Sequence, residues 1–194
     1  MLNCDWKMPF IYLIDINGRM VKAWDRYFGK EAKSMQIEFS EFMDLHSEVD
    51  AVVSPANSFG LMDGGYDAAI TEYFGIGLQE SVRWKILEEF LGEQPVASSL
   101  AVEIPGCSGK ILIHVPSMRM PERIADAGVV YQCMRSALLC AVKHKVKQIV
   151  IPAFGGLTGG VPEEIVSDQM YRAYLQIKGQ LRNPHMETWE TLIN

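Results

Sequence analysis

Two short apolar segments each run directly into a glycine-bearing loop that is followed by a helical pattern. Residues 51–53 lead into Pro55 and a loop with three glycines, and residues 148–151 lead into the cluster FGGLTGG. Short apolar runs bounded by turn residues are typical of strands buried on both faces of a sheet. In open α/β sheets, ligands bind outside the carboxyl ends of such strands. These two junctions are therefore the places where we expect function.

The rest of the chain alternates between strand and helix patterns. Apolar residues recur at helical spacing in two segments, which predicts two helices. Pro162 with Glu163 and Glu164 predicts the start of a third helix, because proline and acidic residues favour the first turn. This alternation predicts an α/β fold. The further strands are expected at residues 10–14, 35–39, 96–104 and 111–115, the first two helices at residues 20–28 and 123–145, and another helix near Tyr66.

Length and composition limit the possible classes of protein. A chain of 194 residues with 48% hydrophobic residues suits one domain. We assign it to residues 1–182, followed by a C-terminal tail over residues 183–194 that shows little periodicity. The formal net charge of −6 argues against general nucleic-acid binding, which depends on Lys and Arg neutralising phosphates.

Targeting and metal signals are missing from the sequence. The four cysteines form no CxxC pair, so they are interpreted as reduced thiols, and neither a metal nor a cofactor is expected. No stretch approaches the roughly 18 apolar residues that span a bilayer. The expected location is therefore the cytoplasm, with no membrane partner, and the oligomeric state stays open.

The first junction, SPANSFGLMDGGYDAAI, combines backbone freedom with polar side chains. Gly64 and Gly65 allow close approach to a ligand, and the amides at the start of the following helix can face an anion. Asn57 can donate to and accept from a sugar hydroxyl, and Asp67 falls in the first helical turn. In the second junction, consecutive amides of the Gly155–Gly160 loop can form a concave nest for phosphate. Neither loop has a Walker or Rossmann spacing.

The run VDAVVSPANSFGLMDGGYDAAI resembles the macro-domain signature, VDAIVNAAN followed by a glycine-rich loop and VDGAI, without a gap. The segment ILIHVP is similar to the family's IHTVGP strand, and IPAFGGLTGGVP stands where the family has FPAISTGIYGYP. The details SPANSFGLMDGG and PSMRMP resemble a divergent bacterial and phage branch of the family. The resemblance implies a three-layer α/β/α macro domain with a mixed central sheet, and ADP-ribose or an ADP-ribosylated substrate as its ligand.

The resemblance also implies roles for particular residues. Asn57 matches the asparagine that contacts the distal ribose, and Asp67 matches the aspartate that assists chemistry at its anomeric carbon in hydrolytic members. Glu41 and Phe42 fall where the family has an Asp-Ile pair that binds adenine, and Asp15 competes for that role. The full predicted ligand-binding set is Glu41, Phe42, Ala56, Asn57, Asp63, Gly64, Gly65, Tyr66, Phe154, Gly155, Gly156, Leu157, Thr158, Gly159 and Gly160, with Asn57 and Asp67 as catalytic candidates. The amides of Gly64, Gly65, Gly156 and Gly160 are expected to hold the diphosphate.

The sequence departs from the family pattern at several positions. Ser54 replaces the first asparagine of NAAN, and Met62 and Asp63 replace glycines of the first loop. An aspartate beside a diphosphate is unfavourable unless its side chain points away. In the second loop, the Ser-Thr-Gly core is absent, and Gly159 replaces the aromatic residue that often shields the distal ribose.

Each candidate also has a simpler structural explanation. Asn57 is a common turn former, and Asp67 is a favourable residue for the first turn of a helix. Phe42 and Phe154 are compatible with core positions, and His114 is interpreted as a core histidine. Arg119 is compatible with either a phosphate contact or a surface salt bridge.

The preferred hypothesis is recognition of ADP-ribose between the two loops, with hydrolysis of ADP-ribosyl linkages as a further possibility. Two alternatives stay open. One is a reader that binds without turnover, and the other is a phage-associated or structural module that has lost the ligand.

Overall fold

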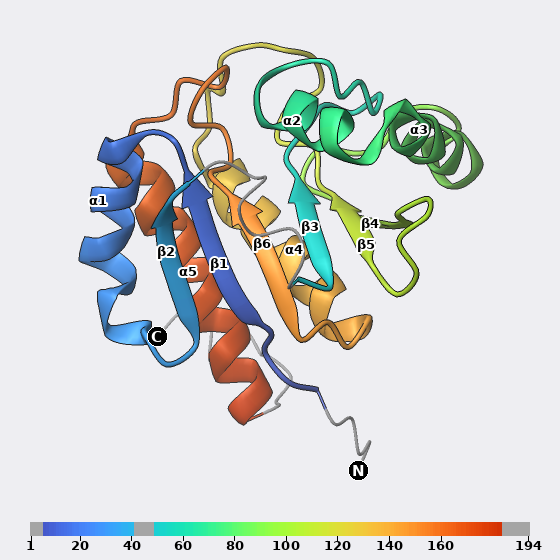
Figure 1. The fold of residues 1–194 in the computed structure, drawn as a ribbon. Helices are drawn as coiled ribbons and strands as arrows, with labels where there is room; N and C mark the ends of the chain where they lie inside the picture. Colours follow the sequence, from blue (N-terminus) through green and yellow to red (C-terminus); the bar gives the residue numbers. More distant parts are fainter. Residues whose placement is uncertain (1–5, 41–48, 184–194) are drawn as a thin grey trace, which may run out of the picture.

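The computed structural model describes residues 6–40 and 49–183 as a six-stranded sheet with helices on both faces (Figure 1). The strands are β1 (Phe10–Asp15), β2 (Met35–Phe39), β3 (Ala51–Ser54), β4 (Leu100–Glu103), β5 (Ile111–His114) and β6 (Gln148–Pro152). The helices are α1 (Gly18–Phe28), the 3₁₀ turn η1 (Gly29–Glu31), α2 (Gly65–Phe74), α3 (Ile76–Phe90), α4 (Gly128–Lys143) and α5 (Glu163–Arg182).

The strand order across the sheet is β2-β1-β6-β3-β5-β4. All neighbouring strands are parallel except β4, which runs antiparallel to β5 at one edge. The sheet is therefore mixed, as predicted. Its central strands β6 and β3 are neighbours, so their carboxyl ends and the two glycine-bearing loops lie at the same edge of the sheet.

Alternating strand residues divide the core into two clusters. Ile11 and Leu13 of β1 pack with α1, α4 and α5 on one face, while Tyr12 and Ile14 pack with α2 and α3 on the other. This alternation follows from the two-residue period of a strand. The predicted three-layer α/β/α architecture is thus confirmed (Figure 1).

Several predicted boundaries differ from the structure for local reasons. Helix α1 begins at Gly18, because the Asn17 side chain accepts a hydrogen bond from the Arg19 amide and caps the helix. Strand β4 begins only at Leu100, because Ala97 has a positive φ of 62° and its amide bonds to the Pro116 carbonyl.

Two larger differences concern helices. Helix α4 begins at Gly128 rather than near Arg123, because the Asp126 carboxylate accepts the Gly128 amide and Ile124 packs against the second glycine loop. Helix α3 was not predicted, although Leu78, Val82 and Ile86 recur every four residues on its buried face. The predicted C-terminal boundary coincides with the end of α5 at Arg182, while the division into domain and tail stays a prediction.

Candidate functional site

Asn57 shapes the first loop, which connects β3 to α2. Its side-chain Nδ2 donates to the Leu61 carbonyl at 2.8 Å, and its Oδ1 accepts from the amides of Phe59 at 3.1 Å and Leu61 at 3.4 Å. The side chain is almost entirely buried. The turn-forming explanation therefore accounts for much of its hydrogen-bonding capacity, and one Nδ2 hydrogen is left for a ligand.

Met62 fastens the same loop to the helices beside it. Its amide donates to Gln79 Oε1 at 2.7 Å, its carbonyl accepts from Thr71 Oγ1 at 3.0 Å, and its side chain is buried in the core. Gly60, with φ of 67°, lies so close to Val82 and Ile86 that a Cβ there would meet them within 3.0 Å. Met62, which replaces a glycine of the family pattern, therefore points its side chain into the core and not toward a ligand.

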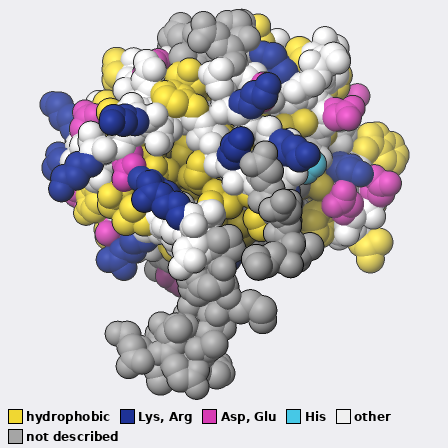
Figure 2. Space-filling view, turned by 90° about the horizontal axis from the view of Figure 1, so that it is seen from below, with side chains coloured by type: hydrophobic (Ala, Val, Ile, Leu, Met, Phe, Trp, Pro, Cys, Tyr) yellow, Lys and Arg dark blue, Asp and Glu magenta, His cyan; other side chains and the backbone are white. Residues whose placement is uncertain are grey.

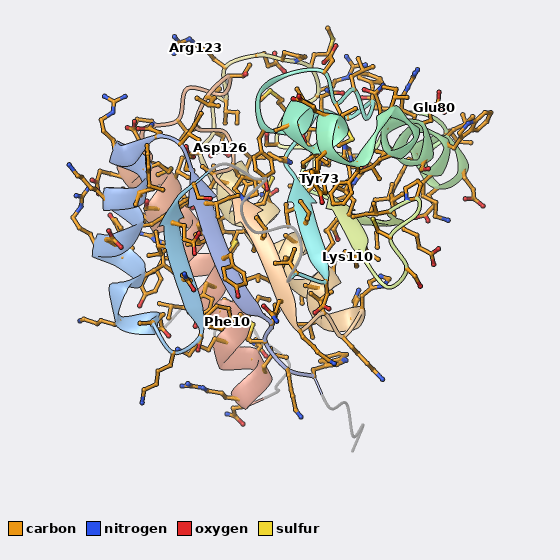
Figure 3. The ribbon with its side chains drawn as sticks, in the orientation of Figure 1. Phe10, Tyr73, Glu80, Lys110, Arg123 and Asp126 are labelled. Atoms are coloured by element: carbon orange, nitrogen blue, oxygen red, sulfur yellow. The ribbon has the colours of Figure 1, made fainter. Side chains whose placement is uncertain are left out.

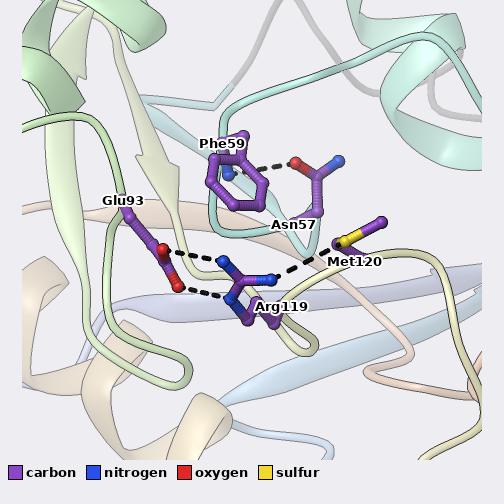
Figure 4. A network of polar contacts seen from close by, with 5 residues as sticks. All are labelled: Asn57, Phe59, Glu93, Arg119 and Met120. Atoms are coloured by element: carbon purple, nitrogen blue, oxygen red, sulfur yellow. Dashed lines mark hydrogen bonds and ion pairs between the residues drawn. The ribbon is translucent and has the colours of Figure 1, made fainter.

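A polar network closes the outer side of the loop (Figure 4). Arg119 makes a two-pronged ion pair with Glu93, at 2.6 and 3.0 Å, and its guanidinium lies 5.2 Å from the centre of the Phe59 ring. The Ser58 amide also donates to the Arg119 carbonyl. Of the two roles considered for Arg119, the structure shows the salt bridge.

Asp67 is buried at the start of α2 and accepts a hydrogen bond from Ser54 Oγ at 2.6 Å. Burial raises the pKa of this carboxyl from 3.8 to about 7; the Ser54 hydrogen bond opposes that rise, and the negative charge of Asp63 adds to it. Asp63 itself is exposed. Near neutral pH, Asp67 can therefore either donate or accept a proton, as a general acid or base must. Ser54 thus holds the carboxyl of Asp67 in place, a role that the sequence pattern did not reveal.

The amino terminus of α2 faces the same region without a cap. Gly64 is the N-cap residue, and no side chain caps the helix. The first amides of a helix have no acceptor within it, so this end can bind an anion. A Cβ built on Gly64 or Gly65 meets nothing within 4 Å. Gly65 needs its positive φ of 54°, whereas Gly64 has no such conformational requirement.

Packing explains three of the four glycines in the second loop, which connects β6 to α5. A Cβ on Gly155 would lie 2.6 Å from Ile124 Cδ1, and one on Gly159 would lie 2.6 Å from both that atom and the Gly155 carbonyl oxygen. Gly160 has a φ of 65° and lies against Arg123. Figure 3 shows Arg123 and Asp126 on the connection from β5 to α4, at the edge of the sheet where the glycine loops lie.

The middle of the second loop, residues 156–158, is partly or fully exposed, whereas Gly159 is buried. Within the part of the chain that the structure describes, no group accepts from the backbone amides of residues 156–159. A Cβ on Gly156 would make only ordinary contact with Ala153, and the conformation of Gly156 does not require glycine. The Gly160 amide, by contrast, donates to the Leu157 carbonyl, so of the second-loop amides predicted to hold the diphosphate, that of Gly156 has no acceptor among the described residues and that of Gly160 is already used.

The remaining predicted ligand residues occupy different environments. Leu157 and Thr158 are exposed, whereas Ala56 and Phe154 are buried. Phe154 lies in the core with no exposed surface, so its ring cannot flank a base in this conformation. Tyr66 is half-buried, and burial together with the charge of Asp67 raises the pKa of its phenol.

Of the two candidate positions for adenine recognition, only Asp15 lies among the described residues. Glu41 and Phe42 fall outside the described residues. Asp15 stands at the carboxyl end of β1, where its Oδ1 accepts from the Asn17 amide at 2.7 Å. Burial raises its pKa, opposed by the Asn17 amide. Since β1 adjoins β6, Asp15 lies at the same edge of the sheet as the second loop.

His114 is a core histidine, as predicted. It is fully buried, its Nδ1 contacts Gln94 Oε1 at 2.6 Å, and burial lowers its pKa to about 3, so the ring is neutral. Gln94 also donates from its backbone to the Ser58 carbonyl and thereby supports the first loop. A single glutamine in a connecting segment gives no sequence signal for this role.

Two surface hollows lie away from both loops. One, of about 160 Å³, is lined by Asp50, His144 and Lys147, and the other, of about 200 Å³, by Trp6 and Leu139 among others. Both are smaller than the roughly 300 Å³ at which pockets for small molecules begin. Neither hollow contains a residue of the candidate site. That site is identified instead by its position at the carboxyl ends of β3 and β6 and by backbone amides that have no acceptor in the described part of the chain.

Neither a metal cluster nor a membrane helix occurs in the described ranges. Across residues 6–40 and 49–183, His, Cys, Asp and Glu side chains form no group of three that could hold a metal ion. Over the same residues, no helix is long and apolar enough to cross a membrane.

Comparison with known proteins places this geometry in a family. The model of the macro domain matches residues 53–170, which include both glycine loops. An uncharacterized protein of Aquifex aeolicus is 32% identical over 123 residues, covering 63% of this chain and 71% of the relative. An uncharacterized protein of Thermotoga maritima is 28% identical over 158 residues, covering 75% of this chain but only 26% of the relative.

Solved structures share the fold at lower identity. The macrodomain of Mycobacterium tuberculosis DarG has a TM-score of 0.58 and 16% identity, covering 69% of this chain and 86% of that one. A mutant macrodomain of Oceanobacillus iheyensis, solved with ADP-ribose, has a TM-score of 0.58 and 19% identity, covering 67% and 71%. With the family model spanning more than half of its residues, the chain belongs to the macro-domain family.

Proposed function

We propose that this protein binds ADP-ribose, free or attached to a carrier, between the first and second glycine loops. The observation that carries the proposal is a pair of loop glycines, Gly64 and Gly156, that neither packing nor backbone conformation requires to be glycine. Neither has a positive φ, and neither has a neighbour that a methyl group would strike. Glycine at such positions is explained by close approach of a ligand to the backbone.

The diphosphate is the part of the ligand that these loops suit. The uncapped start of α2 and the amides of residues 156–159 offer hydrogen-bond donors at the ends of neighbouring parallel strands. Backbone amides in such an arrangement bind phosphate without a positive side chain. This agrees with the net charge of −6, which gives no general attraction for anions.

The two ends of the ligand would meet different residues. At the base, Asp15 or Glu41 accepts a hydrogen bond from the adenine amino group. At the distal ribose, the loop shaped by Asn57 lies over the sugar, and Asp67 stands near its anomeric carbon. The Oceanobacillus iheyensis macrodomain solved with ADP-ribose, which shares the fold of this chain, supports this choice of ligand.

Gly64→Ala tests the proposal. Wild-type protein is expected to be stabilised by ADP-ribose in a thermal-shift panel that also contains ADP and NAD, and to bind it in calorimetry. The added methyl group meets no neighbour in the free protein but occupies ligand space, so affinity should fall at least about tenfold, or roughly 1.4 kcal/mol. The melting temperature should fall only slightly, because alanine is a poorer N-cap residue than glycine.

Gly179→Ala is the matched control. Gly179 also has nothing within 4 Å of an added Cβ, but it lies on α5 away from the loops. Its affinity for ADP-ribose should equal that of the wild type. Lack of response of the wild type to every nucleotide would remove the proposal and favour a module that has lost its ligand.

Hydrolysis of an ADP-ribosyl linkage is the second candidate function, favoured by Asp67. A buried carboxyl with a pKa of about 7 can take a proton from a water molecule that attacks the anomeric carbon. Asp67→Asn should then abolish release of ADP-ribose from a modified substrate while binding is retained. Binding without turnover by the wild type identifies a reader.

A further inference from the structure

Helix α3 carries apolar residues on two opposite faces. Leu78, Val82 and Ile86 are buried against the sheet. Trp84, Leu87 and Leu91 are 70%, 49% and 92% exposed, respectively. Since successive helical residues are turned by about 100°, the second set lies on the side opposite the first. We call Trp84, Leu87 and Leu91 the outer stripe.

The outer stripe is a patch rather than a scatter of single residues. Its members are spaced by three and four positions, so they adjoin along the helix. Isolated exposed apolar residues are ordinary on a protein surface, whereas contiguous ones mark interaction sites. Figure 1 places α3 at the outside of the molecule, and Figure 2 shows hydrophobic side chains standing out on that side among charged ones.

Leu91 adds a second unfavourable feature to its exposure. It ends α3 with φ of 55°, and the Gly92 amide closes the turn onto the Ile86 carbonyl. This left-handed position is usually glycine, because a side chain there is strained. An exposed leucine in a strained conformation lowers the stability of an isolated chain, and a partner that covers it offsets that cost.

Charges beside the outer stripe suit a second copy of the same helix. Arg83 and Glu88 flank the stripe on opposite sides and are five positions apart. In two parallel helices packed side by side, residues with this spacing face each other across the contact. Arg83 makes no ion pair within the described part of the chain, and Glu88 pairs only with Lys85 of its own helix, in an exposed contact. Glu80, on the outer side of α3 one turn before Trp84, limits the stripe (Figure 3).

We propose that a second copy of this chain docks on the outer stripe, forming a two-fold symmetric dimer through α3. Such dimers use the same patch on both copies. Three apolar side chains and their flanks cover a few hundred square ångströms per copy, less than the roughly 800 Å² of a standard interface. Interfaces this small are typical of weak, transient complexes, so we expect a dissociation constant in the micromolar range. The proposal does not depend on the ligand.

Sedimentation equilibrium between about 1 and 200 µM tests the dimer. Wild-type protein is expected to pass from monomer to dimer over this range, and Trp84→Glu to remain a monomer throughout. Leu175→Glu is the matched control, because Leu175 is an exposed leucine, at 43%, on α5. It should dimerise like the wild type. A wild type that stays monomeric at 200 µM, or a Trp84→Glu variant that still dimerises, would overturn the proposal.

Leu91→Gly separates association from folding. Glycine relieves the strain at φ of 55°, so the melting temperature of the dilute monomer should rise. Loss of the exposed side chain should weaken dimerisation at least about fivefold. A Leu91→Gly protein that is more stable and dimerises as tightly as the wild type would contradict the role of the outer stripe.

Discussion

The two glycine-bearing loops follow neighbouring strands but are built by different means. The first is held by side chains: Asn57 bonds back to its own loop, Gln79 holds the Met62 amide, and Ser54 holds Asp67. The second is held by packing of Ile124 against Gly155 and Gly159, and it leaves the amides of residues 156–159 without acceptors in the described part of the chain. The first loop thus supplies a shaped wall and a titrating carboxyl, and the second supplies backbone donors.

In the proposed function, this difference assigns different parts of the ligand to the two loops. Phosphate recognition needs donors that are not already used, and these lie in the second loop and at the start of α2. The proposed hydrolysis at the sugar needs a group whose pKa lies near the working pH, and Asp67 is the candidate for that group. Substitutions that disturb each loop in turn test this division.

Asp67→Asn should have the largest effect, and it should stabilise the protein. Between pH 3.8 and about 7 the folded protein holds a proton on Asp67 that the unfolded chain has lost, so the free energy of unfolding falls as pH rises through this range. At about 1.4 kcal/mol for each tenfold change in proton affinity, the cost above pH 7 is roughly 4 kcal/mol. An asparagine avoids this cost and can still accept from Ser54.

Urea unfolding at two pH values measures this effect. The gain from Asp67→Asn should be about 2 to 3 kcal/mol larger at pH 8 than at pH 5. Asp25→Asn is the control, because its carboxylate is exposed on α1, away from Asp67, and it should show little pH-dependent gain. An Asp67→Asn gain that is equal at both pH values would mean that the carboxyl titrates normally and is a poor candidate for acid–base chemistry.

Gly159→Ala should be the next largest effect, in the opposite direction. Its Cβ would lie 2.6 Å from the Gly155 carbonyl oxygen, so backbone has to move, at a cost of about 1 to 3 kcal/mol. Gly156→Ala in the same loop should leave the free energy of unfolding unchanged or slightly higher, yet weaken ADP-ribose binding. Chemical denaturation measures the free energy of unfolding of both variants, and calorimetry measures their affinity for ADP-ribose. If both variants were equally destabilised, the idea that packing requires glycine at position 159 but not at position 156 would be wrong.

Much of the fold was predictable because periodicity reports burial. Strand β2 was predicted with its observed bounds, and β1 and β3 within one residue, because each is apolar or alternating and ends in turn residues. Helix α3 was missed because its second apolar face hides the usual amphipathic pattern. The late start of β4 depends on a bond between Ala97 and Pro116, residues nearly twenty positions apart, which no local pattern contains.

The candidate site was predictable in place but not in detail. The strand-loop-helix order located both junctions, and the family resemblance singled out Asn57 and Asp67. The roles of other residues depend on neighbours that are distant in the sequence: Ser54 donates a hydrogen bond to Asp67, and Phe154 is buried in the core. The glycine pattern alone did not distinguish Gly156, left open, from Gly159, required by Ile124.

Asn57→Ala should have the smallest effect of the three, a loss of about 1 to 2 kcal/mol of stability, because the three hydrogen bonds of its amide close a short loop. Asn57→Asp keeps the acceptor for the Phe59 and Leu61 amides but loses the donor to the Leu61 carbonyl, so its stability should be intermediate.

ADP-ribose affinity measured on both variants then separates two roles for Asn57. If the side chain acts mainly by shaping the first loop, affinity should follow stability, with Asn57→Asp binding more tightly than Asn57→Ala. If its remaining Nδ2 hydrogen bonds the ribose directly, the aspartate places a negative oxygen where the sugar hydroxyl needs a donor, and its affinity should be the lower of the two. Because the loop already uses most of the hydrogen-bonding capacity of the Asn57 amide, we expect Asn57→Asp to bind ADP-ribose more tightly than Asn57→Ala. Tighter binding by Asn57→Ala would instead indicate that Asn57 contacts the ligand directly.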